Sequence, residues 1–354
     1  MKAWAIMAPD APLELIEVET PQASGSEVVV AVTHCGVCHS DLHFWHGEYN
    51  LGGGQVMKIA DRGITLPRAP GHEIAGRVTA VGPFAEGVAV GDVRVVYPWI
   101  GCGSCAACRT ENDNLCLAQR QLGVMEHGGF ATHVKVPHPR YLIDPGNVDP
   151  GLAATYACSG ITTYSAAQKI LPLEPEQPVV LIGAGGVGLM AISMLRALGH
   201  RAIYSVDISA EKRAAAEEAG ARAIDGTADD LTAAILAATG GPVKAVLDFV
   251  NNSSTARAGL DCLAKGGKLV AVGVAGGELT LSLAALVFGA KSVMGSNTGS
   301  VKDLRAVMAL GNAGKLAPTP ITLCPKHQAN QAMVDLKAGR VTGRIILVEP
   351  RAGA

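Results

Sequence analysis

The stretch "PVVLIGAGGVGLMAISMLRALG", residues 178–199, joins three elements in one run. It begins with an apolar segment, Val179 to Ile182, that is typical of a buried strand. The glycine-rich turn Gly183-Ala184-Gly185-Gly186-Val187-Gly188 follows, and an apolar helix then ends near Gly199. A G-x-G-x-x-G turn between a core strand and a helix can be purely structural. In this full context it favours dinucleotide binding, because the backbone amides can approach a pyrophosphate at the helix N-terminus.

A second strand follows in "RAIYSVDIS", residues 201–209, and ends at Asp207, which lies 19 residues after Gly188. An acidic side chain at this place can accept hydrogen bonds from both ribose hydroxyls and would repel a 2′-phosphate. The sequence therefore favours NAD over NADP. Lys212 and Arg213 come shortly afterwards, so a side chain that accepts the phosphate of NADP stays open as an alternative.

Strands and helices continue to alternate after this point. Helices are predicted over residues 209–219, 230–238 and 255–264, and strands over residues 245–250, 268–274 and 291–296. Such alternation indicates a parallel, doubly wound sheet, which we place at about residues 160–294. The fold class is therefore α/β.

A loop before this region, "GCGSCAACRTENDNLC" (residues 101–116), carries cysteines in the spacing C-x2-C-x2-C-x7-C. Four thiolates can complete the tetrahedral shell of a structural zinc ion, and the loop supplies them at Cys102, Cys105, Cys108 and Cys116. The alternatives are disulfides and a redox pair. Disulfides are disfavoured because the N-terminus has no signal-peptide pattern and the chain has nine cysteines, an odd number. We therefore expect a reduced, cytoplasmic protein.

Composition limits the functional classes further. The chain has 354 residues, 49% of them hydrophobic, and a net charge of −2 from 29 basic and 31 acidic residues. This length suggests two domains. The balanced charge gives no basic surface for nucleic acid, and no apolar run is long enough for a membrane span. A zinc-ribbon interaction module would explain only residues 102–116, so we expect neither nucleic-acid nor membrane partners.

Further polar chemistry lies in "THCGVCHSDLHFWHGE" (33–48), "APGHEIAG" (69–76) and "YACSGITTYSAA" (156–167). Cys38, His72 and Cys158 form a Cys2His set, which is a three-ligand pattern that leaves the fourth zinc position open. The three residues are 34 and 86 positions apart, so their spacing alone does not identify a site.

With "CGVCHSDLH", "GHE", the four-cysteine loop, "GAGGVG" and the terminal "GRIILVE", the chain resembles the zinc-dependent medium-chain dehydrogenase/reductase family, the alcohol dehydrogenases, over essentially its whole length. The resemblance implies a GroES-like, mainly-β catalytic domain formed by residues 1–159 and 295–354. This domain would contain the structural zinc lobe at about 98–118. A Rossmann NAD-binding domain would occupy residues 160–294.

The resemblance also implies roles for individual residues. Cys38, His72 and Cys158 would bind the catalytic zinc, so the chain would hold two zinc ions, one catalytic and one structural. Glu73 would lie beside the metal and Asp41 would orient His72. A zinc-bound alcohol would become the alkoxide by losing its proton through Ser40, the cofactor ribose and His43. The expected cofactor contacts are the glycine turn with Asp207 and Lys212, His39 and Arg344 at the pyrophosphate, and Val272 and Met294 beside the nicotinamide.

The chain departs from the family pattern between Cys38 and His72, where the extra material "GEYNLGGGQVMKIADRGITLPRA" (47–69) is expected to form a loop near the mouth of the active site. Trp45 and Trp99 resemble residues that line the substrate pocket, with core packing as the alternative. We expect them to favour primary or aryl-substituted alcohols.

The expected reaction interconverts an alcohol with its aldehyde or ketone. A polyol or amino-acid-alcohol dehydrogenase would use the same ligands and is the main alternative, whereas a zinc-free quinone reductase would not need Cys38, His72 and Cys158. The resemblance further implies a homo-oligomer, either a tetramer or a dimer.

Overall fold

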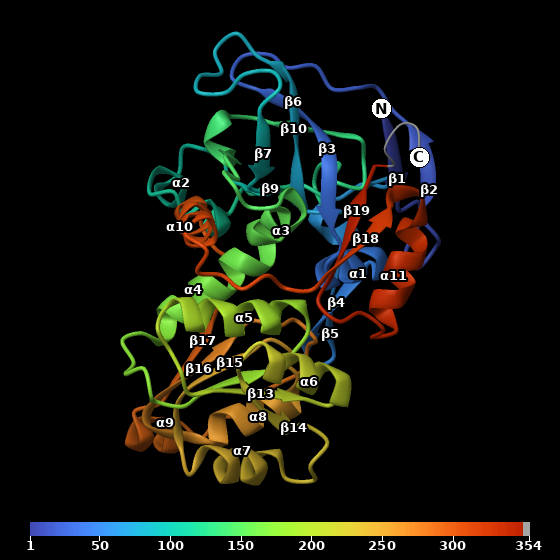
Figure 1. The fold of residues 1–354 in the computed structure, drawn as a ribbon. Coiled ribbons are helices and arrows are strands. Elements are labelled where there is room, and N and C mark those ends of the chain that lie inside the picture. The colour runs from blue at the N-terminus through green and yellow to red at the C-terminus, as the bar shows by residue number, and fades with distance from the viewer. Residues whose placement is uncertain (350–354) are drawn as a thin grey trace.

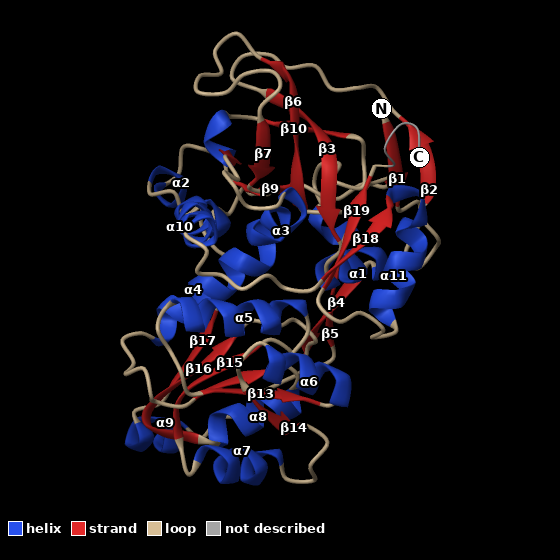
Figure 2. Cartoon of the chain, viewed as in Figure 1, coloured by secondary structure: helices blue, strands red, loops and turns tan. Residues whose placement is uncertain are grey.

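A computed structural model describes residues 1–349 of the chain (Figure 1). The chain folds around two large sheets. The upper part of the molecule consists mainly of strands, and the lower part is a sheet with helices on both faces (Figure 2). Within residues 1–349, no helix is long and apolar enough to span a membrane.

The upper sheet has seven strands in the order β11-β7-β6-β3-β19-β18, with β10 also pairing with β3. Its strands are β3 (Val28–Gly36), β6 (Glu73–Val81), β7 (Val93–Val96), β10 (His133–Val136), β11 (Leu142–Ile143), β18 (Ile321–Pro325) and β19 (Arg344–Val348). The central strand, β3, is rich in valine and mostly buried, as expected for a strand with neighbours on both sides. The C-terminal strands β18 and β19 thus return to the sheet formed by the first part of the chain.

Three two-stranded sheets and several short helices surround this sheet. The pairs are β1 (Lys2–Ala5) with β2 (Glu14–Glu17), β4 (Glu48–Gly52) with β5 (Gln55–Lys58), and β8 (Trp99–Ile100) with β9 (Arg120–Gln121). The helices are α1 (His39–His46), α2 (Ala106–Arg109), α3 (Pro150–Thr155), α10 (Val301–Asn312) and α11 (Ala329–Lys337). The first half of the predicted loop, residues 48–58, therefore forms the β4–β5 hairpin, and the rest is a loop with one short helical turn at Ala60–Arg62.

The lower sheet is parallel throughout and has six strands in the order β14-β13-β12-β15-β16-β17. They are β12 (Val179–Ile182), β13 (Ile203–Asp207), β14 (Arg222–Asp225), β15 (Val243–Asp248), β16 (Leu263–Ala271) and β17 (Ser292–Gly295). Numbered along the chain, this order is 3-2-1-4-5-6, which is the order of dinucleotide-binding folds. The predicted doubly wound sheet is confirmed, although the short edge strand β14 was not predicted.

The helices that flank this sheet are α4 (Ile161–Ile170), α5 (Gly186–Ala197), α6 (Ala210–Glu218), α7 (Leu231–Thr239), α8 (Ser253–Asp261) and α9 (Leu283–Gly289). Polar side chains cap the N-termini of α6, α7 and α8, namely Ser209, Asp230 and Asn252. The helix predicted to reach residue 264 ends at Asp261, because β16 begins at Leu263. Helix α9 was not predicted, since its apolar sequence shows no polar face.

Helix α5 connects the two cores. Met190 and Met194 belong to the core of the upper sheet, whereas Leu189, Ile192 and Leu195 pack into the core of the lower sheet. A helix that is apolar around most of its circumference is expected to be buried on more than one face. The glycine-rich turn that begins α5 therefore lies where the two parts of the molecule meet.

Candidate active site

Three neighbouring strands bring the candidate site residues to one edge of the upper sheet. The end of β3 pairs with the start of β6, Gly36 opposite Glu73, and also with β19. Because both pairings are antiparallel, Cys38 just after β3, His72 just before β6 and Arg344 at the start of β19 meet at the same edge.

Cys158 reaches this edge from a different element. It lies in a π-helical turn, Tyr156–Gly160, between α3 and α4. Single π-helical turns within helices occur frequently at functional sites. The Cys158 Sγ atom is 3.9 Å from the Cys38 Sγ atom.

These residues form a buried cluster that fits a metal ion. One ligand atom from each of Cys38, His72, Glu73 and Cys158 lies within 4.8 Å of the others, and all four residues are buried. Two sulfurs bound to one tetrahedral zinc at about 2.3 Å would be about 3.8 Å apart, close to the observed separation. The buried His72 Nε2 atom has no hydrogen-bond partner among residues 1–349, which is a second indication of a missing ligand.

Asp41 fixes the orientation of His72. Its Oδ1 atom lies 3.2 Å from His72 Nδ1 and accepts a 2.9 Å hydrogen bond from the Gly71 amide, while Oδ2 accepts one from the Cys38 amide. One carboxylate thus connects the segments that carry two of the ligands. Burial lowers the pKa of His72, but Asp41 and Cys38 together outweigh it through their charges and hydrogen bonds, so the pKa of His72 is raised well above its usual value.

The two thiols of the cluster are shifted in opposite directions. The hydrogen bond from Cys158 stabilises the Cys38 thiolate and lowers the pKa of Cys38 well below its usual value. The same bond and burial raise the pKa of Cys158.

Glu73 faces both the cluster and a buried arginine. Glu73 Oε1 accepts a 2.6 Å hydrogen bond from Arg344 Nη2, while Glu73 Oε2 is buried without a partner among residues 1–349. Burial raises the pKa of Glu73 to about 7 despite the nearby guanidinium. Gly36 is required beside it, because a Cβ atom at Gly36 would lie 1.9 Å from Glu73 Oε2.

The glycine-rich turn at the start of α5 has the close contacts that require glycine. Gly183 has a φ of +99°, and a Cβ atom at Gly188 would lie 2.0 Å from the Gly183 oxygen. At Gly185, by contrast, no atom lies within 4 Å of the Cβ position. The Arg344 guanidinium reaches the same turn, with Nη1 3.3 Å from the Cβ position of Gly186. An anion at this helix N-terminus would therefore meet both backbone amides and a guanidinium.

Asp207 lies at the carboxyl end of β13, beside this turn. It accepts hydrogen bonds from the amides of Ala184 (2.8 Å) and Ser209 (2.9 Å). Arg213 is held nearby by the carbonyl oxygens of Asp207 and Ile208 and by the carboxylate of Asp225. The guanidinium of Arg213 is therefore already engaged within the protein.

The cysteine loop forms a second cluster, in which Cys102, Cys105, Cys108 and Cys116 place their sulfurs within 4.8 Å of one another. The Cys105 and Cys108 sulfurs are 3.5 Å apart, and those of Cys102 and Cys108 are 3.9 Å apart. The loop is closely packed, since a Cβ atom at Gly101 would lie 2.4 Å from Cys108 Sγ. Four converging sulfurs with no further donor fit a closed structural site.

Comparisons with known proteins identify the family of the chain. The family "Alcohol dehydrogenase GroES-like domain" matches residues 24–144, and "Zinc-binding dehydrogenase" matches residues 186–313. The chain is 36% identical to an NAD-dependent alcohol dehydrogenase of Sulfurisphaera tokodaii over 351 residues, which cover 98% of this chain and 100% of that protein. The chain belongs to the zinc-binding alcohol dehydrogenase family. It is therefore an oxidoreductase.

Two further relatives extend this comparison. The alcohol dehydrogenase of the archaeon Aeropyrum pernix has a similar structure, with a TM-score of 0.89 and 28% identity over 98% of this chain and 100% of that one. The D-arabinose 1-dehydrogenase (NADP(+)) of Saccharolobus solfataricus is 32% identical, with 95% of this chain and 94% of that protein covered. The predicted family and the predicted GroES-like and Rossmann folds are confirmed.

The resemblance also implied roles for Ser40, His43 and His39, which all lie on α1. Ser40 and His43 are partly buried on α1, directly after Cys38. His39 retains an exposed edge, but the protein around its ring lowers its pKa, and the charges of Arg344 and Lys212 lower it further against the opposing charge of Cys38. The positive charges of Arg344 and Lys212 thus lie close enough to act on His39.

Val272 and Met294 are partly buried near the carboxyl ends of β16 and β17. This is the edge of a doubly wound sheet at which nucleotides bind.

The two tryptophans have different surroundings. The Trp99 ring centroid is 5.3 Å from that of His72, and its Nε1 donates a hydrogen bond to the oxygen of Ala157, next to Cys158. Trp45 has its contacts elsewhere, since its Nε1 donates to the Ala11 oxygen and Lys337 Nζ lies 4.8 Å from the ring centroid. Of these two tryptophans, only Trp99 has a described contact within residues 1–349 to the cluster of Cys38, His72, Glu73 and Cys158.

Two groups of functional interest were not predicted from the sequence. Tyr49 on β4 stacks on His43, with 5.1 Å between ring centroids and 25° between planes. Buried Asp113, beside the cysteine cluster, accepts hydrogen bonds from Arg140 and Tyr141 and so attaches that lobe to the upper sheet. The only sequence signal for the role of Tyr49 was its aromatic side chain in the inserted stretch. No local pattern indicated the role of Asp113.

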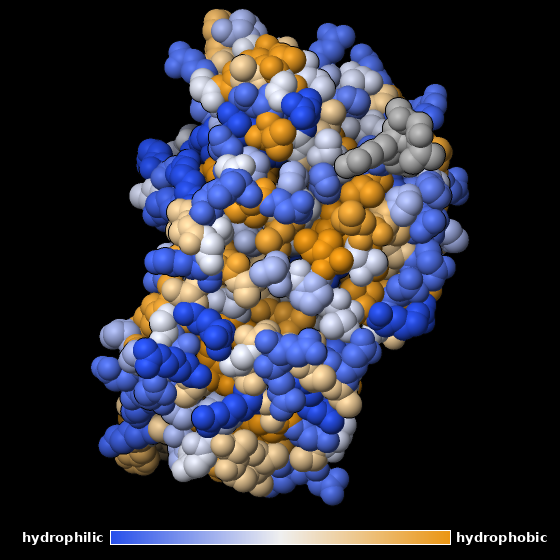
Figure 3. Space-filling view, in the orientation of Figure 1, coloured by the Kyte–Doolittle hydropathy of each residue, from blue (hydrophilic) through white to orange (hydrophobic). Residues whose placement is uncertain are grey.

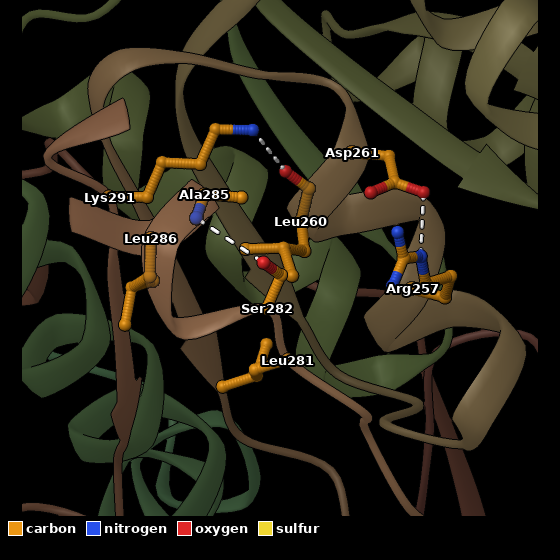
Figure 4. A pocket seen from close by; sticks show the side chains of 8 residues that line it. All are labelled: Arg257, Leu260, Asp261, Leu281, Ser282, Ala285, Leu286 and Lys291. Atoms are coloured by element: carbon orange, nitrogen blue, oxygen red, sulfur yellow. Dashed lines mark hydrogen bonds and ion pairs between the residues drawn. The ribbon is translucent and has the colours of Figure 1, made fainter. Parts of the chain in front are cut away.

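A shallow depression in the nucleotide domain is unrelated to these sites (Figure 4). It lies beside α9, and its polar groups are paired with one another: Lys291 with the Leu260 oxygen, Arg257 with Asp261, and Ser282 with the Ala285 amide. These bonds cap and brace the helices and leave no converging polar groups for a substrate.

Proposed function

We propose that the protein interconverts an alcohol with its aldehyde or ketone, using NAD as the hydride carrier and zinc at the Cys38, His72 and Cys158 cluster. The main support is the buried Nε2 atom of His72, which has no hydrogen-bond partner among residues 1–349, in a cluster with two sulfurs 3.9 Å apart. Zinc bound there would act as a Lewis acid that lowers the pKa of an alcohol hydroxyl, and NAD would accept a hydride from the alcohol carbon.

The surrounding residues orient the ligands and move the proton. Asp41 holds His72 with Nδ1 protonated, so that Nε2 is free to bind the metal. Ser40 and His43 would carry the hydroxyl proton toward solvent, with the cofactor ribose between them. A histidine with a pKa near 6.5 cannot by itself deprotonate an alcohol with a pKa of about 16, so this relay depends on the metal site.

The cofactor contacts form the second part of the proposal. The glycine turn and Arg344 would bind the pyrophosphate, with His39 and Lys212 nearby, and Val272 and Met294 would lie beside the nicotinamide. Asp207 would bind the ribose hydroxyls and repel a 2′-phosphate. The engagement of Arg213 with Asp225 and two carbonyl oxygens supports NAD over NADP, because it leaves that guanidinium committed.

The cysteine loop would hold a second, structural zinc, giving two zinc ions per chain. Its four sulfurs leave no open coordination position for a substrate, so its role would be to stabilise the lobe. We further propose the division into a catalytic domain of residues 1–159 and 295–354 and an NAD-binding domain of residues 160–294. The return of β18 and β19 to the upper sheet supports this division.

A polyol dehydrogenase is the alternative function. It is favoured by the 32% identity to a D-arabinose 1-dehydrogenase, a protein whose substrate carries several hydroxyls. The same metal ligands serve either substrate class, so the lining of the pocket distinguishes them. The ring of Trp99 beside His72 favours an apolar alcohol substituent over a hydroxylated chain.

We also propose that the enzyme is a homo-oligomer, a dimer or tetramer, in which α9 and β17 of two copies meet. Leu283, Val287 and Phe288 on α9 are 73–79% exposed, and hydrophobic atoms show at the lower left of Figure 3, where Figure 1 draws α9. Strand β17 ends the sheet and leaves one edge unpaired. Light scattering should find more than one copy per particle, and Phe288→Asp should lower that number; a monomeric wild type would contradict the proposal.

The function is tested by metal analysis together with a screen of alcohols against NAD and NADP. The wild type should hold two zinc ions per chain and oxidise alcohols with NAD. Cys38→Ser should fold, keep one zinc ion and lose activity, whereas Cys105→Ser should lose the other zinc ion and become unstable. One zinc ion per wild-type chain would contradict the two-site proposal, and activity retained in Cys38→Ser would contradict the catalytic assignment.

A further inference from the structure

The inserted β4–β5 hairpin extends from the end of helix α1 to the nucleotide domain (Figure 1). Its base is fixed by Gly47, whose carbonyl oxygen accepts a 2.9 Å hydrogen bond from the Ile59 amide. Its strands pair Tyr49 with Met57 and Gly52 with Gln55. The hairpin therefore starts at the end of α1, which carries Ser40 and His43. Its tip lies outside the upper sheet.

The tip of the hairpin touches a loop of the nucleotide domain at van der Waals distance. A Cβ atom at Gly52 would lie 2.4 Å from the Gly277 oxygen and 2.8 Å from the Glu278 side chain. From the other side, a Cβ atom at Gly276 would lie 2.6 Å from the Asn50 oxygen. Each surface thus requires a glycine where it meets the other.

The receiving loop, residues 276–278, is firmly attached to its own domain. The Glu278 amide donates a 2.8 Å hydrogen bond to Ser253 Oγ at the start of α8, and Gly276 forms a bridge with Asn252. By contrast, no hydrogen bond within residues 1–349 joins the hairpin to this loop. The contact can therefore open and close without the loss of a hydrogen bond.

The base of the hairpin carries Tyr49, whose ring stacks on the ring of His43 at 5.1 Å. Tyr49 follows the end of α1 by three residues and is part of β4, so its position depends on how the hairpin is held. Stacking on one face of an imidazole limits the rotation of that ring.

We propose that the β4–β5 hairpin is a latch between the two domains, which the 276–278 loop holds in place, and that the latched hairpin keeps Tyr49 against His43. Tyr49 is then a positioning residue for the proton relay, a role that rests on the function proposed above. The latch itself depends only on the packing of Gly52, Gly276 and Asn50.

The latch is tested by hydrogen–deuterium exchange of residues 48–58 in the zinc-loaded enzyme without substrate. Gly276→Ala should speed exchange in the hairpin about tenfold, because the new methyl group displaces Asn50 and the hairpin opens more often. Gly240→Ala is the matched control, since Gly240 lies in the same domain with a φ of +75° and no atom within 4 Å of its Cβ position. Unchanged hairpin exchange in Gly276→Ala, or an equal increase in Gly240→Ala, would overturn the latch.

The role of Tyr49 is tested by steady-state kinetics. Tyr49→Leu should lower kcat about fivefold to tenfold with little change in the KM for NAD, and Tyr49→Phe, which keeps the aromatic ring, should restore the rate. A wild-type rate in Tyr49→Leu, or no rescue by Tyr49→Phe, would overturn the positioning role. If the wild type oxidised no alcohol with NAD, the proposed function would fail, while the exchange experiment would still decide the latch.

Discussion

Arg344 donates a hydrogen bond of 2.6 Å to the carboxylate of Glu73, and both side chains are almost completely buried. The same guanidinium lies at the N-terminus of α5, so one residue joins the metal cluster to the expected pyrophosphate site. A buried ion pair of this kind contributes little net stability, but the removal of one partner leaves the other buried without its hydrogen bond.

Arg344→Met should therefore lower the free energy of unfolding by about 1–3 kcal/mol and weaken the binding of NADH. Replacement of Glu73 as well, in Glu73→Gln with Arg344→Met, should recover most of the stability but not the affinity for NADH. Urea unfolding and a fluorescence titration with NADH measure the two effects. An unchanged affinity for NADH in Arg344→Met would show that this arginine does not contact the cofactor.

Asp207→Asn should change the choice between NAD and NADP. The substitution keeps the shape of the side chain but removes the charge that would repel a 2′-phosphate, so the ratio of kcat/KM for NADP to that for NAD should rise about tenfold, or about 1.4 kcal/mol. Asp229→Asn, at an exposed position of the same domain, is the control for net charge. An equal change of this ratio in both variants would show that it responds to overall charge and not to Asp207.

The cysteine lobe depends on the absence of a side chain at Gly101. In Gly101→Ala the new methyl group would lie 2.4 Å from Cys108 Sγ and 2.8 Å from Asp113 Oδ1. We expect this variant to lose one of two zinc ions by metal analysis and to unfold at a lower temperature, with the Cys38 cluster still loaded.

Gly103→Ala provides the matched control for the lobe. Gly103 lies in the same loop, has a φ of +80° and has no atom within 4 Å of its Cβ position, so it reports backbone strain without crowding. If Gly103→Ala lost as much zinc as Gly101→Ala, strain rather than contact with Cys108 would explain the loss.

Zinc uptake at the Cys38 cluster should release protons. The pKa of His72 is raised by Asp41, against burial, and the pKa of Cys158 is raised by its hydrogen bond to Cys38 and by burial. Zinc binds only the neutral imidazole and the thiolates, so protons should leave when zinc binds and the zinc affinity should fall as the pH is lowered.

Calorimetry in two buffers of different ionisation enthalpy measures this release, after a chelator has emptied the cluster and metal analysis has shown that the lobe is still loaded. In Asp41→Asn the pKa of His72 loses the carboxylate that raises it, so about one proton fewer should be released. The zinc affinity should also fall about 10-fold to 100-fold. If the wild type and Asp41→Asn released the same number of protons, Asp41 would not control the protonation of His72.

Local patterns in the sequence predicted the parallel sheet and the cysteine lobe, whereas the upper sheet was expected only from the family resemblance. The strand, turn and helix at residues 178–199 predicted β12 and α5 because a short apolar run, a glycine-rich turn and a longer apolar run follow one another directly. The four-cysteine spacing predicted the lobe because all its ligands lie within one loop. The Cys38, His72 and Cys158 cluster required the family resemblance, since strand pairing between β3 and β6 and a π-helical turn bring these residues together from distant positions.

Contacts between segments explain what the sequence did not predict. The inserted stretch appeared as a loop because its alternation is short and interrupted by three glycines, yet those glycines shape a hairpin tip that packs on another domain. The stacking of Tyr49 on His43 arises from that packing, and Asp113 acquires its role only when Arg140 and Tyr141 fold against it. Neither relation has a local signature.

The choice of substrate should depend on Trp99 more than on Trp45. Trp99 lies beside His72, whereas the indole of Trp45 contacts Ala11 and Lys337. We expect the wild type to prefer benzyl alcohol to sorbitol, and Trp99→Leu to reduce this preference about tenfold, because an aromatic contact with the substrate ring contributes about 0.5–1.5 kcal/mol beyond burial. Trp45→Leu should lower stability and leave the preference nearly unchanged. Values of kcat/KM for the two alcohols decide the matter: a wild type that favours sorbitol would support the polyol alternative, and an equal effect of both substitutions would place Trp45 in the pocket as well.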